Sequence, residues 1–397
     1  MTKPLMSQRE FVALNAMMFA VLAIAIDSML PALPEIAASL SPDAPNLAQL
    51  VITSFIFGMG VGTLISGPLS DSFGRKPVML VCAGLYIAGA AACFMAPTLE
   101  TLLAARVLMG LGAAGPRAVG SALIRDLYRG SEMARIMSFV MMVFTLVPAV
   151  APLMGQGVIL VAGWRELFLI FMVFSLVVHT WFLLRQVETL PPEARRPLSL
   201  GKLAQAGREL VTHRIALIST ACQALTAGAL FANLSSMEGI FREYFDRGAT
   251  FPAWFTVIAL CAMTGSAINA RFVVRLGMRK MVRRAYGFQV ALTVVTLGLF
   301  YFGLVSGIAA FALFMLWTIS GFATMGLTMG NLNAMAMESL GHIAGFASSL
   351  IAAISTVAST LLAIPVGQAF DGTPLPLMVG TLVFSVTAFV LSGLLRK

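Results

Sequence analysis

The sequence predicts an all-α membrane protein in which twelve spanning helices form two six-helix halves. The first observation is composition: 59% of the 397 residues are hydrophobic and only 11% are charged, whereas soluble domains carry about 25% charged residues. The second is that apolar stretches of about 20 residues, each able to cross about 30 Å of hydrocarbon, follow one another along nearly the whole chain. The third is a polar segment near 186–213 that divides these stretches six and six.

The expected spans follow directly from the apolar stretches, in chain order. They cover residues 11–33, 47–70, 77–96, 99–122, 136–160, 165–185, 214–237, 252–274, 284–304, 308–335, 343–369 and 375–395. We therefore expect an N-terminal six-helix bundle over 1–185, a linker over 186–213 and a C-terminal six-helix bundle over 214–397. No stretch remains for a sizeable soluble domain.

The net charge of +9 reports membrane topology rather than a nucleic-acid partner. An even number of spans puts both termini on one side, and that side carries almost all of the Lys and Arg residues. The opposite side keeps only Arg165, Arg242 and Arg247. Because positive charge favours the cytoplasmic face, we expect a multi-pass protein of the inner (plasma) membrane with both termini in the cytoplasm.

Two opposite charges fall inside spans at matching depth. Asp27 lies about 9–10 Å from the end of its helix near Leu33, and Arg106 lies about 10 Å from the start of the fourth span near Leu99. Each charge is costly alone in a bilayer, so pairing or water contact is expected. A carboxylate whose cationic partner comes and goes can take up and release a proton. A static structural pair, or an Arg106 that reaches lipid headgroups, remains the alternative.

The loop after the second span contains Gly67-Pro-Leu-Ser-Asp71-Ser-Phe-Gly74-Arg75-Lys76-Pro77. Gly67 and Asp71 share one helix face, and Gly74 permits a tight turn. The string resembles the signature loop of the major facilitator superfamily, GxLaDrxGrkxxl. That resemblance implies a twelve-helix major facilitator fold around a central cavity, in which this loop is a latch that stabilises the outward-open state.

Other strings resemble the Bcr/CflA-type drug:proton antiporters of that superfamily. Asp27-Ser-Met-Leu-Pro31-Ala-Leu-Pro34 is similar to their first-helix pattern, and the segment from Arg106 to Gly110 to their fourth-helix motif, with Met109 in place of Gln. The fifth span contains an antiporter-like motif at Pro148, Ala151, Pro152 and Gly155, in which Ala151 and Gln156 replace two usual glycines. These departures leave strict antiport open, and helix packing alone also selects small residues.

The second half of the chain echoes the first. About 200 residues after Gly74 comes Arg275-Leu-Gly277-Met-Arg279-Lys280, but Val274 stands where the first loop has Asp71. Half-length repeats are typical of secondary transporters with a site at the midplane. Glu238 and Glu338 lie near predicted helix ends, where a solvated surface is expected. Four polar residues are candidates for a substrate cavity, or equally for hydrogen bonds between helices: Gln223, Asn233, Asn331 and Asn333. Met29 is a fifth cavity candidate, because methionines can form an adaptable apolar wall, although they also face lipid.

The sequence contains no phosphate-binding G-x-x-x-x-G-K-[ST] loop, HExxH pair or nucleophile elbow, so nothing favours an enzyme. We expect proton-driven efflux of lipophilic or amphipathic small molecules, such as drugs or antibiotics, by a monomer that uses no cofactor. Its partners would be the substrate, protons and membrane lipids. The alternatives are a metabolite exporter for an amino acid, sugar or siderophore, a proton symporter, and a membrane receptor that transports nothing.

Overall fold

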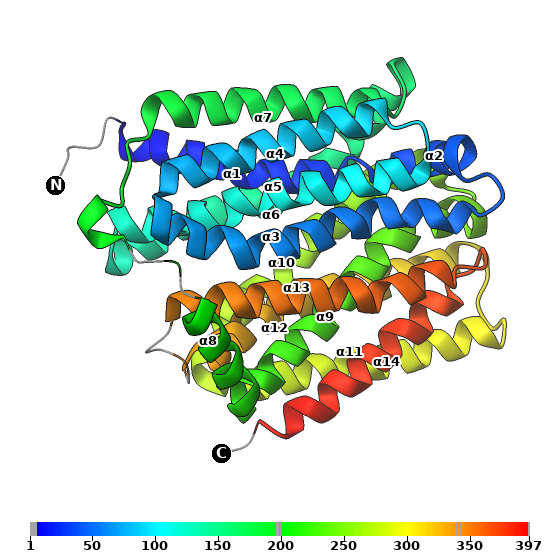
Figure 1. The fold of residues 1–397 in the computed structure, drawn as a ribbon. Coiled ribbons are helices and arrows are strands. Elements are labelled where there is room, and N and C mark those ends of the chain that lie inside the picture. Colours follow the sequence, from blue (N-terminus) through cyan, green and yellow to red (C-terminus); the bar gives the residue numbers. More distant parts are fainter. Residues whose placement is uncertain (1–5, 196–197, 199, 339, 341–343, 396–397) are drawn as a thin grey trace. The chain divides into compact units, whose positions relative to one another are not determined.

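Long apolar helices account for almost all of the chain (Figure 1). A computed structural model describes residues 6–195, 198, 200–338, 340 and 344–395. They divide into two units, the first formed by Met1–Ser41 and Ser54–Leu203 and the second by Pro42–Thr53 and Ala204–Lys397. Helices suit a bilayer because each satisfies its own backbone hydrogen bonds.

The first unit contains seven α-helices, and two of them share one span. They are α1 (Gln8–Asp27), α2 (Leu33–Leu40), α3 (Leu50–Phe73, whose first four residues belong to the second unit), α4 (Arg75–Met95), α5 (Leu99–Leu127), α6 (Gly130–Val161) and α7 (Glu166–Arg185). The helix α1 ends at Asp27 and is followed by a 3₁₀ turn over Leu30–Ala32. Pro31 and Pro34 lack the N–H group that would continue the α-helix, so the first span breaks directly after its carboxylate.

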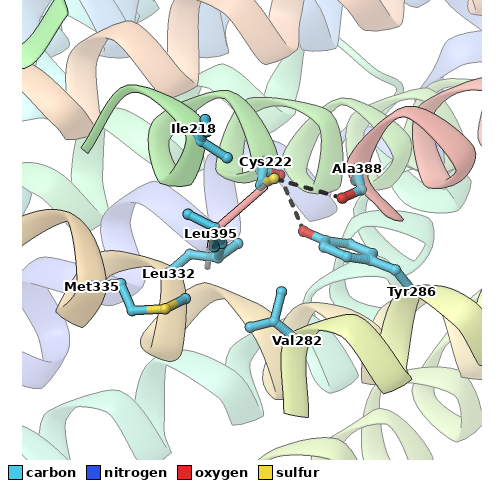
Figure 2. Close-up of a cluster of buried hydrophobic side chains, with 8 residues drawn as sticks. All are labelled: Ile218, Cys222, Val282, Tyr286, Leu332, Met335, Ala388 and Leu395. Carbon is cyan, nitrogen blue, oxygen red and sulfur yellow. Dashed lines mark hydrogen bonds between the residues drawn. The ribbon is translucent and has the colours of Figure 1, made fainter. Parts of the chain in front are cut away.

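The second unit is built from α9 (Arg214–Gly239), α10 (Phe251–Leu276), α11 (Met278–Tyr301), α12 (Gly307–Glu338), α13 (Ala344–Gln368) and α14 (Leu375–Gly393). The shorter α8 (Leu200–Thr212) precedes them. Figure 2 shows one part of the core, where Tyr286 donates to the carbonyl of Cys222 over 3.3 Å and the Cys222 thiol faces the carbonyl of Ala388 at 3.8 Å. Apolar side chains of α9, α11, α12 and α14 surround these contacts.

Residues 42–53 belong to the second unit through a reciprocal contact. The Asn46 amide donates to the carbonyls of Gln368 and Phe370 over 3.1 and 2.7 Å, and the Gln368 amide donates to the carbonyl of Asn46 over 2.8 Å. This contact was not anticipated from the sequence. Apart from this segment, the boundary between the two units falls between Leu203 and Ala204 inside α8, which lies within the predicted linker 186–213.

The described helices agree with the predicted all-α membrane fold. Eleven of them are long and apolar enough to cross a membrane. The remaining predicted span, 284–304, is the ninth in chain order and corresponds to α11. The first turns of α11 carry Arg279, Lys280, Arg283 and Arg284, so its apolar part is shorter. With α1 and α2 taken as one interrupted span, each unit supplies six of the predicted helices.

Candidate functional site

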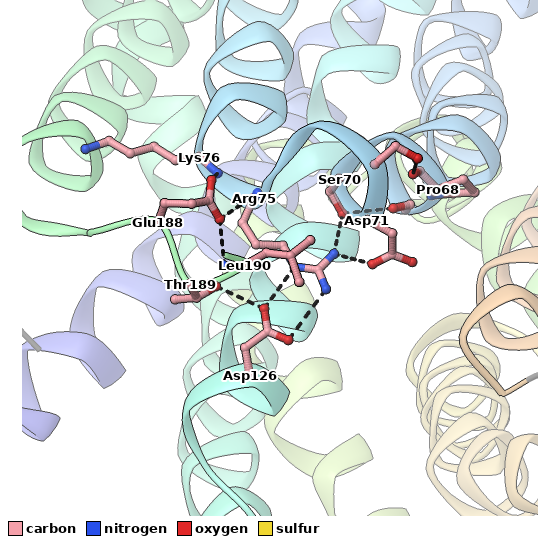
Figure 3. Close-up of polar contacts among 11 residues, drawn as sticks. Pro68, Ser70, Asp71, Arg75, Lys76, Asp126, Glu188, Thr189 and Leu190 are labelled. Atoms are coloured by element: carbon pink, nitrogen blue, oxygen red, sulfur yellow. Dashed lines mark hydrogen bonds and ion pairs between the residues drawn. The ribbon is translucent and has the colours of Figure 1, made fainter. Parts of the chain in front are cut away.

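The loop between α3 and α4 is the centre of a polar cluster in the first unit (Figure 3). The guanidinium of Arg75, only 6% exposed, forms ion pairs with Asp71 at the end of α3 and with Asp126 near the end of α5. Its Nε lies 2.9 Å from Asp126 Oδ2, and its Nη1 donates to Ser70 Oγ over 2.8 Å. One buried cation therefore joins three helices: α3, α4 and α5.

The first residues after α7 complete this cluster. The Glu188 carboxylate accepts from the backbone N–H groups of Arg75 and Lys76, both over 3.0 Å, and from that of Leu190 over 2.9 Å. Thr189 Oγ1 donates to Asp126 Oδ2 over 2.9 Å. The first N–H groups of a helix lack internal partners and favour a negative charge. Glu188 therefore caps α4 from a distant part of the chain. We call Ser70, Asp71, Arg75, Asp126, Glu188 and Thr189 the signature-loop cluster.

Gly74 is needed at the tight turn for two reasons. Its φ of 106° lies in the region that L-residues with side chains avoid. A Cβ atom at this position would also lie 2.6 Å from Glu188 Oε2. The Lys76 side chain points away from the carboxylates (Figure 3), so of the two loop cations only Arg75 belongs to the cluster.

Asp27 lies at the end of α1, 5% exposed. Within the described part of the chain, its carboxylate makes no hydrogen bond or ion pair. The next residue, Ser28, packs directly against Gly155 of α6, where a Cβ atom would collide with the carbonyl of Ser28. Ala151 and Pro152, one turn before Gly155, are also buried. The antiporter-like motif of α6 thus supports the backbone at the break that follows Asp27.

Arg106 is fully buried on α5 and reaches the same segment of α1. Its Nη2 donates to the carbonyl of Ala25 over 3.2 Å, its Nη1 lies 3.7 Å from Met109 Sδ, and its Cζ lies 4.4 Å from the ring centroid of Phe55. Among the described residues no ion pair joins Arg106 to Asp27. The expectation for these two charges was pairing or water contact, and the described contacts show Arg106 bound to the α1 backbone near Asp27 instead of to its carboxylate.

Comparison with known proteins identifies this arrangement. The family model described as Major Facilitator Superfamily matches residues 15–363. The chain belongs to the Major Facilitator Superfamily. It is 29% identical over 370 residues to a Bacillus subtilis protein named "Uncharacterized MFS-type transporter YdgK", covering 92% of this chain and 89% of that protein.

A second relative carries a functional name. The chain is 27% identical over 378 residues to a Haemophilus influenzae protein named "Bicyclomycin resistance protein homolog", covering 92% of this chain and 91% of that protein. Among solved structures, a D-xylose-proton symporter matches with a TM-score of 0.75 over 96% of this chain and 95% of that one, at 14% identity. That likeness shows the fold alone. As a major facilitator, the chain is a multi-pass membrane transporter of small molecules and not an enzyme.

In this major facilitator the structure describes the surroundings of each of the five cavity candidates within its own unit. Asn233 lines a small cavity inside the second unit, together with Gln289, Trp317 and Thr318. Gln223 and Met29 are buried, on α9 and directly after α1 respectively. Asn331 of α12 donates to Asn269 Oδ1 of α10 over 2.7 Å and to the carbonyl of Leu327 over 2.8 Å. The first of these is a hydrogen bond between helices, which was the alternative to a cavity role. Asn333 is exposed.

One expectation needs correction, and three residues were missed as cluster members. Glu238, expected at a solvated helix end, is only 6% exposed. Asp126, Glu188 and Thr189 belong to the signature-loop cluster but were not assigned to it from the sequence. For Asp126 a signal existed, because Arg125-Asp126 closes the fourth span; nothing in the local sequence directs Glu188 to a helix 112 positions earlier.

Proposed function

We propose that this transporter exports lipophilic or amphipathic small molecules, such as drugs or antibiotics, in exchange for protons across the inner membrane. The observation that carries the proposal is the buried Asp27 at the break of α1, where Arg106 of α5 contacts Ala25 and Gly155 of α6 packs against Ser28. In this proposal both termini lie in the cytoplasm and a monomer works without a cofactor. The energy comes from the proton gradient.

A carboxylate in this position suits proton transfer. A charged carboxylate inside a bilayer is costly, so such residues usually face protein or water and move ions or substrates. Uptake of a proton removes the charge of Asp27, and its release restores it. The Arg106 guanidinium donates to the α1 backbone at Ala25, two residues before Asp27. In this proposal a movement of α5 or α1 brings that cation to Asp27 at one stage of the cycle. An opposite charge at that moment favours release of the proton.

The signature-loop cluster is proposed as the switch that follows this proton step. Arg75 holds the ends of α3, α4 and α5 together, and Glu188 adds the segment after α7. In this proposal the cluster is intact in one major state of the transport cycle and is broken in another. A buried ion pair that loses one partner is strongly destabilised, so in this proposal the cluster is either complete or fully separated rather than half broken.

The name of the Haemophilus relative favours drug export over the alternatives. "Bicyclomycin resistance protein homolog" describes that relative, and resistance is what efflux of an antibiotic produces. The alternative of a metabolite exporter shares the same proton chemistry and differs only in the substrate. The altered residues Ala151 and Gln156 in the α6 motif keep symport as a second candidate, because that motif is the one that marks antiporters.

Flux in liposomes tests the proposal and its main alternatives. Purified protein is reconstituted with the fluorescent cation ethidium inside and outside, and a pH gradient of either sign is imposed while the membrane potential is clamped. Antiport predicts that ethidium moves against its gradient towards the acidic side. Movement towards the alkaline side would establish symport. Flux that does not respond to the pH gradient, for ethidium and for a panel of antibiotics, would contradict the proposal.

Arg106→Lys tests whether the cation assists the proton step. The guanidinium donates to Ala25 O, contacts Met109 Sδ and stacks on Phe55, and an ammonium group cannot reproduce this planar geometry. We expect pH-driven transport to fall by at least about tenfold, corresponding to about 1.4 kcal/mol. The measurement is the rate against pH with the variant purified in folded form. An unchanged rate and pH profile would show that Arg106 is structural.

A further inference from the structure

The second unit contains a buried carboxylate of its own. Glu238 is the penultimate residue of α9 and is 6% exposed, close to the 5% of Asp27. Phe241, one turn later, is fully buried and packs against Phe245, Phe251, Phe311 and Phe314. Glu238 therefore lies one turn before a buried aromatic cluster, on whose Phe311 ring Arg247 stacks at 4.6 Å, rather than at the solvated helix end that its position suggested.

Glu238 has a single weak cationic partner among the described residues. The Nε atom of Arg242 lies 3.8 Å from Glu238 Oε1, beyond the 2.7–3.2 Å of a hydrogen bond. Arg242 is 44% exposed and donates instead to Glu243 over 3.1 Å. The helices packed against α9, which are α12, α13 and α14, carry no charged residue within their bounds except Glu338, the last residue of α12. Nothing from those helices fixes Glu238 as an anion.

Both buried carboxylates lie on the first spanning helix of their unit, near the point where the α-helix ends. α1 is the first spanning helix of the first unit and α9 that of the second. The α-helix ends at Asp27 in one and directly after Glu238 in the other. A 3₁₀ turn over Leu30–Ala32 follows Asp27, and a π-turn over Ile240–Tyr244 follows Glu238. π-turns inside helices are frequent at functional sites. The sequence repeat is weak here, so the correspondence became visible only in the structure.

Three unpaired polar atoms precede Glu238 on α9. The Oδ1 of Asn233 and the hydroxyl groups of Ser235 and Ser236 have no hydrogen-bond partner among the described residues, and all three side chains are at most 5% exposed. Ser235 lies three residues before Glu238, on the same helix face. Buried polar groups in this situation are normally satisfied by water. Water at these atoms would give Glu238 a source of protons.

We propose that Glu238 is a second proton-binding residue of this transporter, so that each unit contributes one carboxylate and two protons enter per cycle. The role of Glu238 in coupling rests on the proposed proton-driven transport, but the binding of a proton by Glu238 does not. A proton from water neutralises Glu238 while it is buried. It is released when the π-turn brings the carboxylate nearer to Arg242 or to water. No bond other than O–H is made or broken.

Infrared spectroscopy of the purified protein measures the proton directly. The C=O stretching band of protonated carboxyl groups is recorded between acidic and alkaline buffer, in water and in D₂O. We expect two buried components, of which Asp27→Asn removes one and Glu238→Gln the other. Glu243→Gln is the matched control, because Glu243 shares Arg242 but is 45% exposed, and it should leave both components in place. A wild-type band that Glu238→Gln does not change would overturn the proposal.

The coupling ratio gives a second readout that separates the two proposals. With the potential clamped, the ethidium gradient at which flux is zero should rise about tenfold per pH unit for each coupled proton. Wild type should therefore balance about a hundredfold gradient at one pH unit, and Glu238→Gln about a tenfold gradient. An unchanged ratio in Glu238→Gln would reject the second site and leave antiport intact. Absence of pH-driven flux in wild type would reject antiport, while the infrared result would still decide Glu238.

A conservative variant guards against misfolding. Glu238→Asp keeps the carboxyl group and shortens the side chain, so the infrared component should remain and shift in position. If Glu238→Gln elutes as aggregate in size-exclusion chromatography, Glu238→Asp decides the matter alone. If both infrared components of the folded Glu238→Asp variant are the same as in wild type, proton binding at this site is contradicted.

Discussion

The loops after α3 and after α10 share a glycine turn and basic residues but differ in their ion pairs. Each turns at a glycine in the left-handed region, Gly74 with φ 106° and Gly277 with φ 81°, and each starts a new helix at the next residue. In the first loop Arg75 is buried between carboxylates (Figure 3). In the second, Val274 replaces Asp71 and is 90% exposed.

The difference lies in acidic partners rather than in the turn or the cations. Among the described residues, Arg275, Arg279 and Lys280 of the second loop form no ion pair. Within the described ranges, no distant carboxylate caps the start of α11 as Glu188 caps α4. Basic residues at a turn are enough to set membrane topology. The proposed switch needs carboxylates as well, and of the two loops only the first has them among the contacts that the structure describes.

Arg75→Ala should give the largest effect, and Arg279→Ala in the second loop is its matched control. Loss of the buried guanidinium leaves Asp71 and Asp126 without their cation, at a cost of about 3–5 kcal/mol. Arg279→Ala should change stability by no more than about 0.5 kcal/mol. The measurement is the pH-driven transport rate, with thermal stability in detergent. Similar losses of transport rate and stability in both variants would mean that the two loops have the same role.

Asp71→Asn should slow switching without weakening substrate binding. Asn keeps an oxygen that can accept from Arg75 but loses the charge, and Asp71 is 34% exposed, so we expect about 1 kcal/mol and a severalfold slower turnover. Binding of ethidium in detergent and transport in liposomes are measured side by side. A large loss of affinity with normal turnover would reject the switch role. Val274→Asn in the second loop should change neither quantity.

Glu188→Gln should give a smaller effect, because the backbone of α4 keeps one acceptor. The amide oxygen of Gln can replace only one carboxylate oxygen, and the charge at the helix start is lost, which costs about 0.3–1 kcal/mol. We expect transport to fall by about twofold to fivefold, with greater salt dependence than in wild type. Glu193→Gln, an exposed position in the same segment, is the control. Equal effects of the two substitutions would show that Glu188 has no special role.

The fold could be predicted almost completely from the sequence. Apolar length and the polar segment near 186–213 give the helices, and Gly74 and Gly277 mark turns that only glycine favours. What the apolar pattern does not contain is the break after Asp27, because the residues beyond it remain apolar. Pro31 and Pro34 are the local signal for that break.

The site could be predicted only where its residues are close in sequence. Asp71, Gly74 and Arg75 lie in one string, and Asp27 is conspicuous because its surroundings are apolar. Glu188 and Asp126 reach Arg75 through tertiary packing, which periodicity does not encode. Glu238 was misjudged because its helix was expected to end at 237; the α-helix continues to Gly239 and then into a π-turn, which keeps the carboxylate buried.

Asp27→Asn tests the proton chemistry of this transporter most directly. Asn has nearly the same shape and cannot exchange a proton, so the variant separates coupling from folding. Two assays use the same proteoliposomes: accumulation of ethidium driven by a pH gradient, and exchange of labelled for unlabelled ethidium without a gradient. We predict that Asp27→Asn loses the first and keeps the second. Accumulation equal to that of wild type across the pH gradient would contradict the assignment of Asp27 as the proton carrier.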